Sequence, residues 1–356
     1  MPPCSGGHPH PAHSLKKQPS KPTIASRPGE LTIDLVAAAA GVSTATVSRF
    51  FNSPERLRKS TAARVQEVVN RLGYVPNLLA GGLSSSRTRM VAAVIPTMSN
   101  SIFSSTIQAI SDTLADQGYS VVLGLTGAND QHTERQILSI IGRRPDGIIL
   151  TGAVPSANTR MKLKASGIPT IETWDLPQDP IDMAVGFSHE AVGRAIGEHI
   201  LRGGGRRVFI VSAGGVRALA RRYGVTKMLV ENGVPEPAIA TFPGITTFGD
   251  GRRAVAAHLD AGGRPDVIVC SSDWGAHGAL DELRRRGIRV PADVAVLGFG
   301  DIAFAGELDP PLTTVKIDGQ VIGENATKFL MKRARGQNVR HRVVDVGFEL
   351  IVRASG

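Results

Sequence analysis

Short, nearly continuous apolar runs recur along the chain from residue 90 onward. Most are followed by ten to fifteen residues with helical periodicity, a pattern typical of a parallel, doubly wound α/β sheet. The runs are MVAAVIP, YSVVLGL, DGIIL, IPTIET, RRVFIVS, PDVIVCS and DVAVLGF. Seven or more strands exceed one comfortable sheet, so the pattern predicts two similar subdomains with a cleft between them. Ligands of such sheets bind beyond the carboxyl ends of the strands, which makes the cleft the expected site.

Three short helical patterns precede these runs. Thr32 is expected to cap the run IDLVAAAA, Gly41 to supply a turn, and Ser43 to cap the run TATVSRFF. Ser60 is expected to cap a longer helix, TAARVQEVVNRLG, which Gly73 closes. Helix, tight glycine turn and second helix together form an all-α helix-turn-helix pattern.

Small apolar residues are expected to let these helices cross closely. They are Ala38, Val42, Val47 and Val65. The opening of the second helix is polar, so it is expected to stay exposed, and DNA would be read there.

The chain is expected to divide into four segments. Residues 1–29 are rich in Pro, Gly, Ser and His with almost no large apolar side chains, which predicts a disordered basic tail. Residues 30–75 form the helix-turn-helix domain, and residues 90–356 form the two-subdomain core. Between them, residues 76–89 form a hinge helix or linker, whose two adjacent glycines leave it unstructured until something orders it.

The composition favours a globular protein, with 42% hydrophobic and 20% charged residues. No stretch offers the roughly 18 uninterrupted apolar residues of a membrane helix, and the first thirty residues lack the apolar segment of a signal peptide. A cytoplasmic protein with no membrane partner is therefore expected. Cys4 and Cys270 lie in unrelated contexts and provide neither a disulfide framework nor a metal-ligand spacing. No metal and no cofactor are expected.

The positive charge is distributed very unevenly. Residues 1–89 hold 12 Lys and Arg against 4 Asp and Glu, whereas the remaining residues hold 29 against 27. A quarter of the chain thus carries most of the formal net charge of +10. Such a distribution indicates a module that approaches polyphosphate, attached to a nearly neutral body.

The segments TIDLVAAAAGVSTATVSRFFN and VVNRLGYVPN resemble those of the lactose/galactose repressor (LacI/GalR) family of bacterial transcription regulators. The resemblance runs in register through residues 31–352 and includes PADVAVLGFGDIAFA and PPLTTVKID. ETWDLPQDPIDMAVGFSHE and LSSSRTRMVAAVIPTMSNSIF look most like the gluconate-type, or sugar-acid, repressors. The resemblance implies a core like that of the periplasmic binding proteins, which binds a small-molecule effector and dimerises.

For the second helix, the resemblance implies that Thr44, Ala45 and Arg49 face the bases in the major groove. Arg can donate two hydrogen bonds to guanine, and small Thr and Ala suit a thymine methyl group. The positions that match phosphate contacts are Ser43, Thr46, Ser48 and Asn52. Thr46 and Ser48 are alternatively ordinary polar helix surface.

The hinge also matches DNA-contacting positions of the family. Asn77, Ala80 and Leu83 are implied to bind DNA, with Ala80 and Leu83 at the minor groove, where an apolar wedge kinks the duplex. Gly81 stands where many members have Arg, so a phosphate contact is in doubt there and the unbound hinge is expected to be floppier.

In the core, six positions match the effector site of the family: Phe103, Trp174, Arg221, Ser272, Asp273 and Asp301. An aromatic ring can stack on a sugar, while Asp and Arg bind hydroxyls or an acid group. Phe103 alternatively only packs, and Asp273 alternatively only caps a helix. Many relatives have two successive Asp residues where this chain has Gly300 and Asp301, which weakens the case for a neutral hexose.

Three arginines are expected near the cleft, namely Arg217, Arg221 and Arg222. They suggest an anionic effector, a sugar acid or a phosphorylated sugar, with gluconate or a close relative as the first candidate. Only part of the cluster can face inward, since successive helical residues point about 100° apart.

We therefore expect a homodimeric repressor of carbohydrate or sugar-acid catabolism genes that binds a palindromic double-stranded DNA operator and responds to an effector. The alternative is a solute-binding sensor with the same core and no DNA role. An enzyme is not expected, and no catalytic residue is assigned. The glycines at residues 203–205 follow a helix rather than a strand, and no GxxxxGK[ST], GxSxG or HExxH motif exists.

Overall fold

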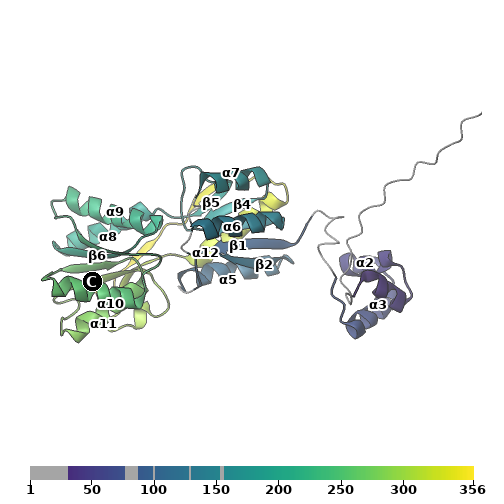
Figure 1. Cartoon of the computed structure of the whole chain (residues 1–356), viewed down its shortest axis with the longest axis horizontal. Helices are drawn as coiled ribbons and strands as arrows, with labels where there is room; N and C mark the ends of the chain where they lie inside the picture. Colours follow the sequence, from purple (N-terminus) through teal and green to yellow (C-terminus); the bar gives the residue numbers. More distant parts are fainter. Residues whose placement is uncertain (1–30, 77–86, 99–100, 128–129, 153–155) are drawn as a thin grey trace, which may run out of the picture. The chain divides into compact units, whose positions relative to one another are not determined.

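A computed structural model describes residues 31–76, 87–98, 101–127, 130–152 and 156–356. The chain divides between residues 83 and 84 into two compact units, which are coloured along the sequence in Figure 1. The predicted tail and most of the predicted hinge lie outside the described residues. No helix in the described ranges is both long and apolar enough to cross a membrane.

The first unit contains the predicted helices. They are α1 (Ile33–Ala40), α2 (Thr44–Asn52) and α3 (Lys59–Leu72), with a 3-10 turn, η1 (Pro54–Arg56), before α3. The side chains of Thr32 and Ser43 cap α1 and α2, which confirms both predicted helix starts. Gly41 and Gly73 end α1 and α3 in the left-handed conformation, also as predicted.

The predicted cap of α3 is wrong. The helix begins one residue before Ser60, at Lys59, and Arg58 occupies the N-cap position without a capping side-chain hydrogen bond. The backbone is extended at Leu57 and Arg58 and becomes helical at Lys59, one residue earlier than predicted. Ser60 therefore lies within the first turn.

A small apolar core holds the three helices together. Its buried members are Val36, Ala37, Ala40, Val47, Val65, Val68 and Tyr74. Val42 packs against this cluster, so three of the four residues predicted to lie between the helices do so. Ala38 is exposed instead, because the neighbouring residues Val36 and Ala37 turn the buried face of α1 away from it.

The second unit contains two six-stranded sheets. In the first, the strand order is β11-β5-β4-β3-β1-β2; in the second it is β12-β10-β9-β8-β6-β7. The bounds are β1 (Met90–Ile95), β2 (Ser120–Leu125), β3 (Gly147–Thr151), β4 (Thr170–Thr173), β5 (Met183–Gly186), β6 (Val208–Ala213), β7 (Ala238–Phe242), β8 (Val267–Cys270), β9 (Ala295–Gly300), β10 (Thr313–Lys316), β11 (Val343–Asp345) and β12 (Glu349–Ile351). All seven predicted runs are strands. Pairing is parallel except between β10 and β12.

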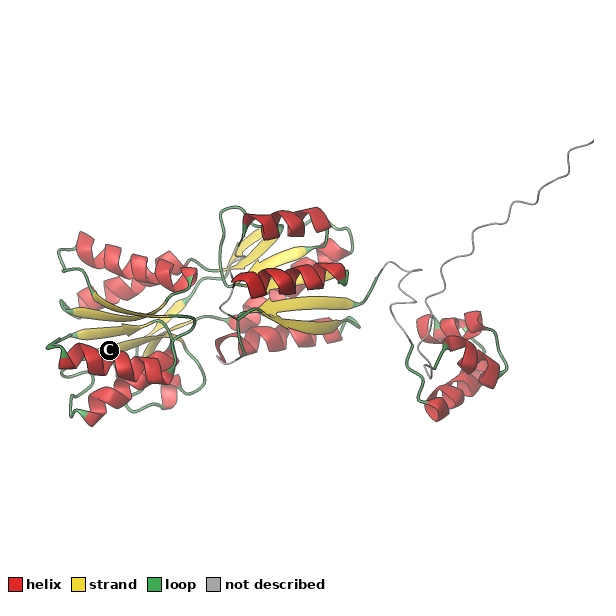
Figure 2. Ribbon diagram, viewed as in Figure 1, coloured by secondary structure: helices red, strands yellow, loops and turns green. Residues whose placement is uncertain are grey.

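Helix pairs cover both sheets, as Figure 2 shows. Within the first subdomain α5 packs on α12 and α6 on α7; within the second, α8 packs on α9 and α10 on α11. The bounds are α5 (Ser104–Ala115), α6 (Asp130–Gly142), α7 (Ala157–Ser166), α8 (His189–Arg202), α9 (Val216–Glu231), α10 (Phe248–Asp260), α11 (Asp273–Arg285), α12 (Gly319–Ala334), η2 (Ser101–Phe103) and η3 (Ala305–Glu307). The prediction of two doubly wound parallel-sheet subdomains is confirmed.

The two subdomains are joined by three passages of the chain. The first follows β5, the second follows β10 and leads to α12, and the third joins β11 to β12. Residues far apart in the sequence therefore lie in one subdomain, since α12 and β11 complete the first. The segment after β4 accepts hydrogen bonds from helices of the second subdomain, and the candidate effector site takes residues from both subdomains.

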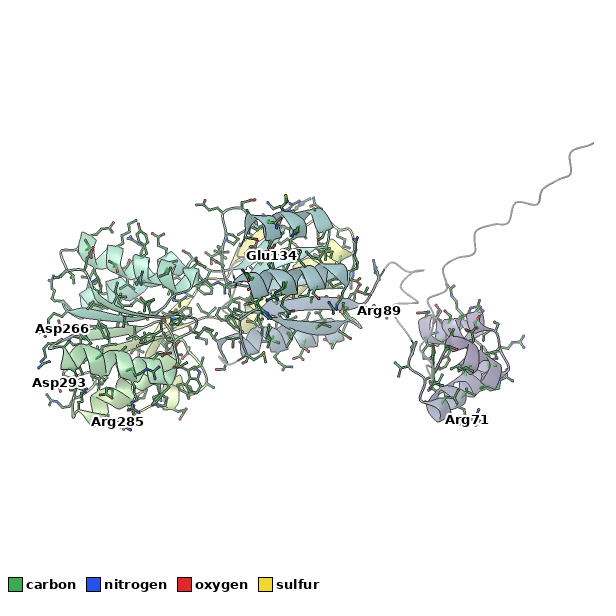
Figure 3. All side chains as sticks on the ribbon, viewed as in Figure 1. Arg71, Arg89, Glu134, Asp266, Arg285 and Asp293 are labelled. Atoms are coloured by element: carbon green, nitrogen blue, oxygen red, sulfur yellow. The ribbon has the colours of Figure 1, made fainter. Side chains whose placement is uncertain are left out.

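Several ion pairs lie on the outer surface of the core. Figure 3 labels Arg285 and Asp293, whose partners are Asp281 at 3.1 Å and Arg289 at 2.7 Å. Exposed pairs of this kind contribute about 0–1 kcal/mol each, so they do not decide the fold.

Candidate functional site

The polar face of α2 stands free of the helical core. Val47 is fully buried, whereas Thr44, Ala45, Ser48 and Arg49 are exposed. Arg49 takes part in no ion pair within the described residues, so its guanidinium is available to another molecule. The helix thus presents the two small side chains and the arginine that the sequence assigns to base contacts.

The residues assigned to phosphate contacts are tied together within α2. Ser43 Oγ accepts a hydrogen bond from the Thr46 amide at 3.2 Å, and the two hydroxyls lie 2.9 Å apart. The Asn52 side-chain amide donates to the Ser48 carbonyl at 3.0 Å. These contacts fix the side chains before any ligand arrives. The hinge positions Asn77, Ala80 and Leu83, with Gly81, lie outside the described residues.

Two aromatic side chains predicted for the effector site meet in the first subdomain. Phe103 lies edge to face with Trp174, with ring centroids 5.0 Å apart. Trp174 is 2% exposed, and its indole N–H donates to Thr106 Oγ1 at 3.0 Å. It directly follows β4 at φ 66°, a left-handed conformation that costs a bulky residue about 1–3 kcal/mol. Strain of this kind tends to cluster at functional sites.

Arg221 of α9 connects to Trp174 through His189. Its Nη1 lies 3.0 Å from His189 Nδ1, and His189 Nε2 lies 2.9 Å from the Trp174 carbonyl. A carbonyl only accepts, so Nε2 carries the proton and Nδ1 accepts from the guanidinium. Arg221 also donates to the Ser271 carbonyl at 3.2 Å and lies 3.7 Å above the Phe299 ring.

Burial and like charge shift the pKa values of this pair. Burial, with the nearby guanidinium groups of Arg221 and Arg217, lowers the pKa of His189 to about 2. Burial, with the charge of Arg217, lowers the pKa of Arg221 to about 9. At neutral pH the imidazole is therefore uncharged and the guanidinium is charged.

Two glycines place His189 against Arg221. A Cβ on Gly193 of α8 would lie 2.0 Å from the Arg221 carbonyl, and one on Gly224 of α9 would lie 2.3 Å from the Glu190 carbonyl. Only hydrogen atoms fit in these gaps, so α8 and α9 approach closely just beside the imidazole and the guanidinium.

The other two arginines have hydrogen-bond partners different from those of Arg221. Arg217 Nη2 donates to the Thr173 carbonyl at 2.8 Å, and its Nε lies 3.7 Å from Asp175 Oδ2. This Nε is buried and has no hydrogen-bond acceptor within 3.5 Å among the described residues. Arg222 instead contacts the Thr241 hydroxyl of β7 at 3.2 Å. Arg217 therefore reaches the first subdomain, whereas Arg221 and Arg222 both border a small hollow of the second.

The remaining predicted effector residues are bound within the protein. Ser272 caps α11 and its Oγ lies 2.7 Å from Thr246 Oγ1, so the interpretation of Asp273 as the cap is wrong. Asp273 accepts hydrogen bonds from the Ile302 amide and the Thr314 hydroxyl. Burial raises its pKa to about 6.

Asp301 lies 2.7 Å from Arg353, and its φ is 46°. The preceding Gly300 has φ 131°, a region that L side chains rarely adopt. A Cβ there would lie 3.2 Å from Ile102 Cδ1 and 3.5 Å from Asp273 Oδ2. An aspartate in place of Gly300 would therefore be strained in this backbone, which gives a physical reason for the departure from the family pattern.

The sequence did not single out the residues that join these groups. His189, Ser271 and Phe299 complete the surroundings of Arg221, and Thr106 anchors Trp174. One signal was available: His189 and Ser271 come just after β5 and β8, at the carboxyl ends where parallel sheets place their ligands.

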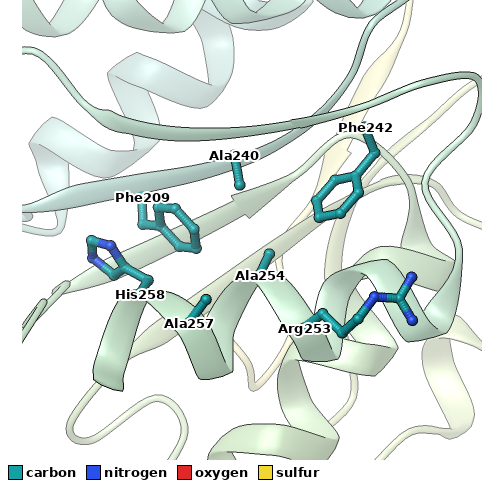
Figure 4. Close-up of a pocket in the computed structure, with 7 residues that line it drawn as sticks. All are labelled: Phe209, Ala240, Phe242, Arg253, Ala254, Ala257 and His258. Carbon is teal, nitrogen blue, oxygen red and sulfur yellow. The ribbon is translucent and has the colours of Figure 1, made fainter. Parts of the chain in front are cut away.

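The hollow beside Arg221 is small, about 20 Å³, and is bordered by Ser271 and Phe299. A larger hollow of about 440 Å³ lies elsewhere, between β6, β7 and α10, and is open and mainly apolar. Figure 4 shows its lining, with His258 stacked on Phe209 at 4.0 Å. None of the predicted site residues borders it.

Comparisons with known proteins cover almost the whole chain. Residues 32–77 match the family described as bacterial regulatory proteins, lacI family, and residues 198–356 match a periplasmic binding protein-like domain. The HTH-type transcriptional regulator GntR of Pseudomonas aeruginosa is 32% identical over 92% of this chain and 96% of that protein.

Solved structures agree. A LacI-family transcriptional regulator from Silicibacter pomeroyi has a TM-score of 0.86 and 31% identity, over 92% of this chain and 99% of that one. A complex of the transcriptional regulator CelR with cellobiose has a TM-score of 0.65 and 26% identity, over 92% of this chain and all of that one.

Proposed function

Because the chain belongs to the LacI family of bacterial regulatory proteins, and is thus a DNA-binding transcriptional repressor with an effector-binding core, we propose that its effector is a sugar acid. The genes it controls are then those of sugar-acid catabolism, with gluconate or a close relative as the signal. The similarity to GntR-type regulators supports this subgroup. Relatives in the comparisons are regulators rather than enzymes, and we propose no catalytic role.

The observation that carries the proposal is the environment of Arg221. Its partners within the described residues are uncharged: the neutral His189 ring, the Ser271 carbonyl and the Phe299 ring. No described carboxylate lies within ion-pair distance of this guanidinium. A partly buried cation without a counter-ion is costly, and a bound acid group would remove that cost through charge-assisted hydrogen bonds.

The DNA end of the proposal rests on α2. Arg49 reads a guanine in the major groove, while Thr44 and Ala45 contact bases or a thymine methyl group. The helix is positioned on the phosphates by two pairs of side chains: Ser43 and Thr46 at the start of α2, and Ser48 and Asn52 one turn apart along it. Asn77, Ala80 and Leu83 bind the DNA from the hinge. Two copies in a homodimer address the two halves of a palindromic operator.

For the effector contacts, we propose that Arg221 binds the acid group and that Phe103 and Trp174 border the apolar face of the sugar. Ser272, Asp273 and Asp301 contribute hydroxyl contacts once the subdomains rearrange, since all three are engaged within the protein in the present arrangement. A phosphorylated sugar is the second candidate, because phosphate also suits a guanidinium.

A solute-binding sensor without a DNA role is not favoured. The match of residues 32–77 to the lacI-family model supports DNA binding, and the exposed polar face of α2 is compatible with it.

Thermal stability tests the effector proposal. Gluconate binds only the folded core, so saturating gluconate should raise the melting temperature of the wild-type protein, whereas sorbitol should not. Arg221→Ala should abolish the shift. Arg194→Ala removes a guanidinium of α8 that pairs with Glu231 at 3.5 Å and does not border the hollow beside Arg221, so this change should preserve the shift. A shift that survives in Arg221→Ala would remove Arg221 from the acid site.

A further inference from the structure

Two successive carbonyls of the first subdomain are held by donors from the second. The Thr173 carbonyl accepts from Arg217 Nη2 at 2.8 Å, and the Trp174 carbonyl accepts from His189 Nε2 at 2.9 Å. Arg217 lies on α9 and His189 begins α8, so both hydrogen bonds join the subdomains directly. The segment after β4 is thereby fastened to the helices that carry the cleft arginines.

The next residue, Asp175, places a carboxylate beside the same arginine. Its Oδ2 lies 3.7 Å from Arg217 Nε, within ion-pair distance but beyond hydrogen-bond distance. The other oxygen accepts from the Leu176 amide at 2.8 Å. A Cβ on Gly186 would lie only 2.4 Å from the Asp175 backbone, so the close approach of β5 holds this segment in place.

The charge of Arg217 is therefore paired with that of Asp175, but one of its N–H groups makes no hydrogen bond to a described residue. Its Nε is buried and, in the part of the chain that the structure describes, has no acceptor within hydrogen-bond distance. Burial lowers the pKa of the guanidinium despite the carboxylate of Asp175. The negative charge of Glu172 also acts on the Arg217 guanidinium. The direct partners of the Glu172 carboxylate are Arg160 at 3.2 Å and the Ile181 amide at 2.7 Å. An incoming acid group that reached Nε would complete the site, whereas Asp175 does not.

The hollow beside Arg221 has no room for such an acid. The hollow beside Arg221 is about 20 Å³, enough for a water-sized object, whereas sites for small organic ligands are about 300–1,000 Å³. An acid bound in this hollow would have to move the residues that line it, all of which belong to the second subdomain. An acid that reached Arg217 would have to loosen its contacts with Thr173 and Asp175.

We propose that Asp175 is a built-in anion that competes with the effector for Arg217 and holds the subdomains in the effector-free arrangement. An acid group of the effector displaces the Asp175 carboxylate by accepting a hydrogen bond from Arg217 Nε. The contacts of Arg217 with Thr173 and Asp175 are then broken. A neutral sugar does not compete for the guanidinium, so the same carboxylate selects for anions. This inference rests on the proposed function, because it places the acid group at the cleft arginines.

Asp175→Asn tests the inference with little change of shape, because Asn keeps the oxygen that accepts from Leu176. Asp179→Asn is the matched control: Asp179 is 81% exposed and contacts Lys164 at 3.0 Å, away from Arg217. Both changes are made in a Trp274→Phe background, which leaves Trp174 as the only tryptophan and makes its fluorescence a report on the cleft. The probes are gluconate, inorganic phosphate and sorbitol.

Removal of the competing charge should tighten anion binding by about three- to tenfold in Asp175→Asn, judged from a unit charge about 4 Å away at the dielectric constant of water, about 80, since the Asp175 side chain is 39% exposed. Asp179→Asn should bind as the parent does, and sorbitol should be unaffected by either change.

Failure of the inference and failure of the proposed function give different results. If gluconate binds the parent but Asp175→Asn binds it equally or more weakly, at an unchanged melting temperature, the competition is refuted and the sugar-acid proposal stands. If Asp175→Asn tightens phosphate alone and gluconate binds no variant, the competition stands and gluconate is not the effector. If neither anion binds any variant, both are refuted.

Discussion

At the residue scale, the pair His189 and Arg221 shows how burial fixes the chemistry of the cleft. The imidazole is 5% exposed, and its ring donates to Trp174 and accepts from Arg221, so both nitrogens are satisfied only in the neutral form. A protonated ring would place two cations 3.0 Å apart. The residue therefore orients the guanidinium without adding charge to the acid-binding position.

The protonation of His189 predicts a dependence of stability on pH. Its pKa is about 2 in the folded protein and 6.5 in the unfolded chain, so between these values the unfolded state binds a proton that the folded state does not. Stability is full above about pH 6.5 and is lost as pH falls, by about 1.4 kcal/mol per pH unit. His189→Gln preserves a donor and an acceptor but does not titrate.

Urea denaturation at pH 7, 6 and 5 measures this contribution. Between pH 7 and 5, wild type should lose about 2 kcal/mol relative to His189→Gln. The carboxyl of Asp273, whose pKa is raised to about 6 by burial, acts in the opposite direction but is common to both proteins and cancels. Parallel pH profiles for the two proteins would mean that the His189 pKa is not lowered.

Arg49 is the residue predicted to recognise a base of the operator sequence. Arg49→Ala removes one bidentate contact, so operator binding should weaken by about 1–3 kcal/mol and one guanine position should become tolerant of other bases. Electrophoretic mobility shifts on a set of substituted operators give both quantities. Gluconate affinity should not change, and an equal loss of gluconate binding would show that the variant is misfolded.

At the element scale, the glycine contact between α8 and α9 connects packing to the site. Gly193→Ala would place a methyl group 2.0 Å from the Arg221 carbonyl, forcing the helices apart. Overpacking of this kind costs about 1–3 kcal/mol, and the shift of α9 should also weaken gluconate binding. Calorimetry of unfolding and of binding measures both effects.

Gly203→Ala is the matched control for this change. Gly203 follows the last turn of the same helix, its φ is −77°, and the nearest atom to an added Cβ is 3.6 Å away. It should leave stability and binding nearly unchanged. If Gly193→Ala behaves as Gly203→Ala does, the close approach of the helices does not position Arg221.

Elements differ in how well the sequence predicted them. The seven apolar runs and both helix caps before α1 and α2 were readable, because buried parallel strands are continuously apolar and caps have specific side chains. β11 and β12, of three residues each, carry half-exposed or exposed side chains and no apolar run. They exist because their partner strands are already in place, which only the assembled sheet reveals.

The candidate site was predicted only in part for a similar reason. The resemblance supplied Phe103, Trp174 and Arg221. Arg221 and Arg222 have different hydrogen-bond partners, as helical geometry predicted, but both border the same small hollow. His189 and Asp175 acquire their importance from contacts across the cleft. No local sequence pattern predicts that the Asp175 carboxylate lies 3.7 Å from Arg217, which is forty-two positions further along the chain.

At the scale of the whole molecule, the chain passes between the core subdomains three times, so rearrangement of the cleft must involve both. The proposed acid group acts on Arg217 and Arg221, whose hydrogen bonds reach both subdomains. Coupling between effector and operator is reciprocal: if gluconate weakens operator binding by some factor, the operator weakens gluconate binding by the same factor.

The most direct test of the account is the release of operator DNA by gluconate, measured by fluorescence anisotropy of a labelled operator at fixed salt. Gluconate should release the operator from the wild-type protein, while sorbitol should not. Arg221→Ala should bind the operator as tightly as wild type and keep it at every gluconate concentration. The account would be contradicted if gluconate did not release the operator from the wild-type protein, or if it released the operator from Arg221→Ala as readily as from wild type.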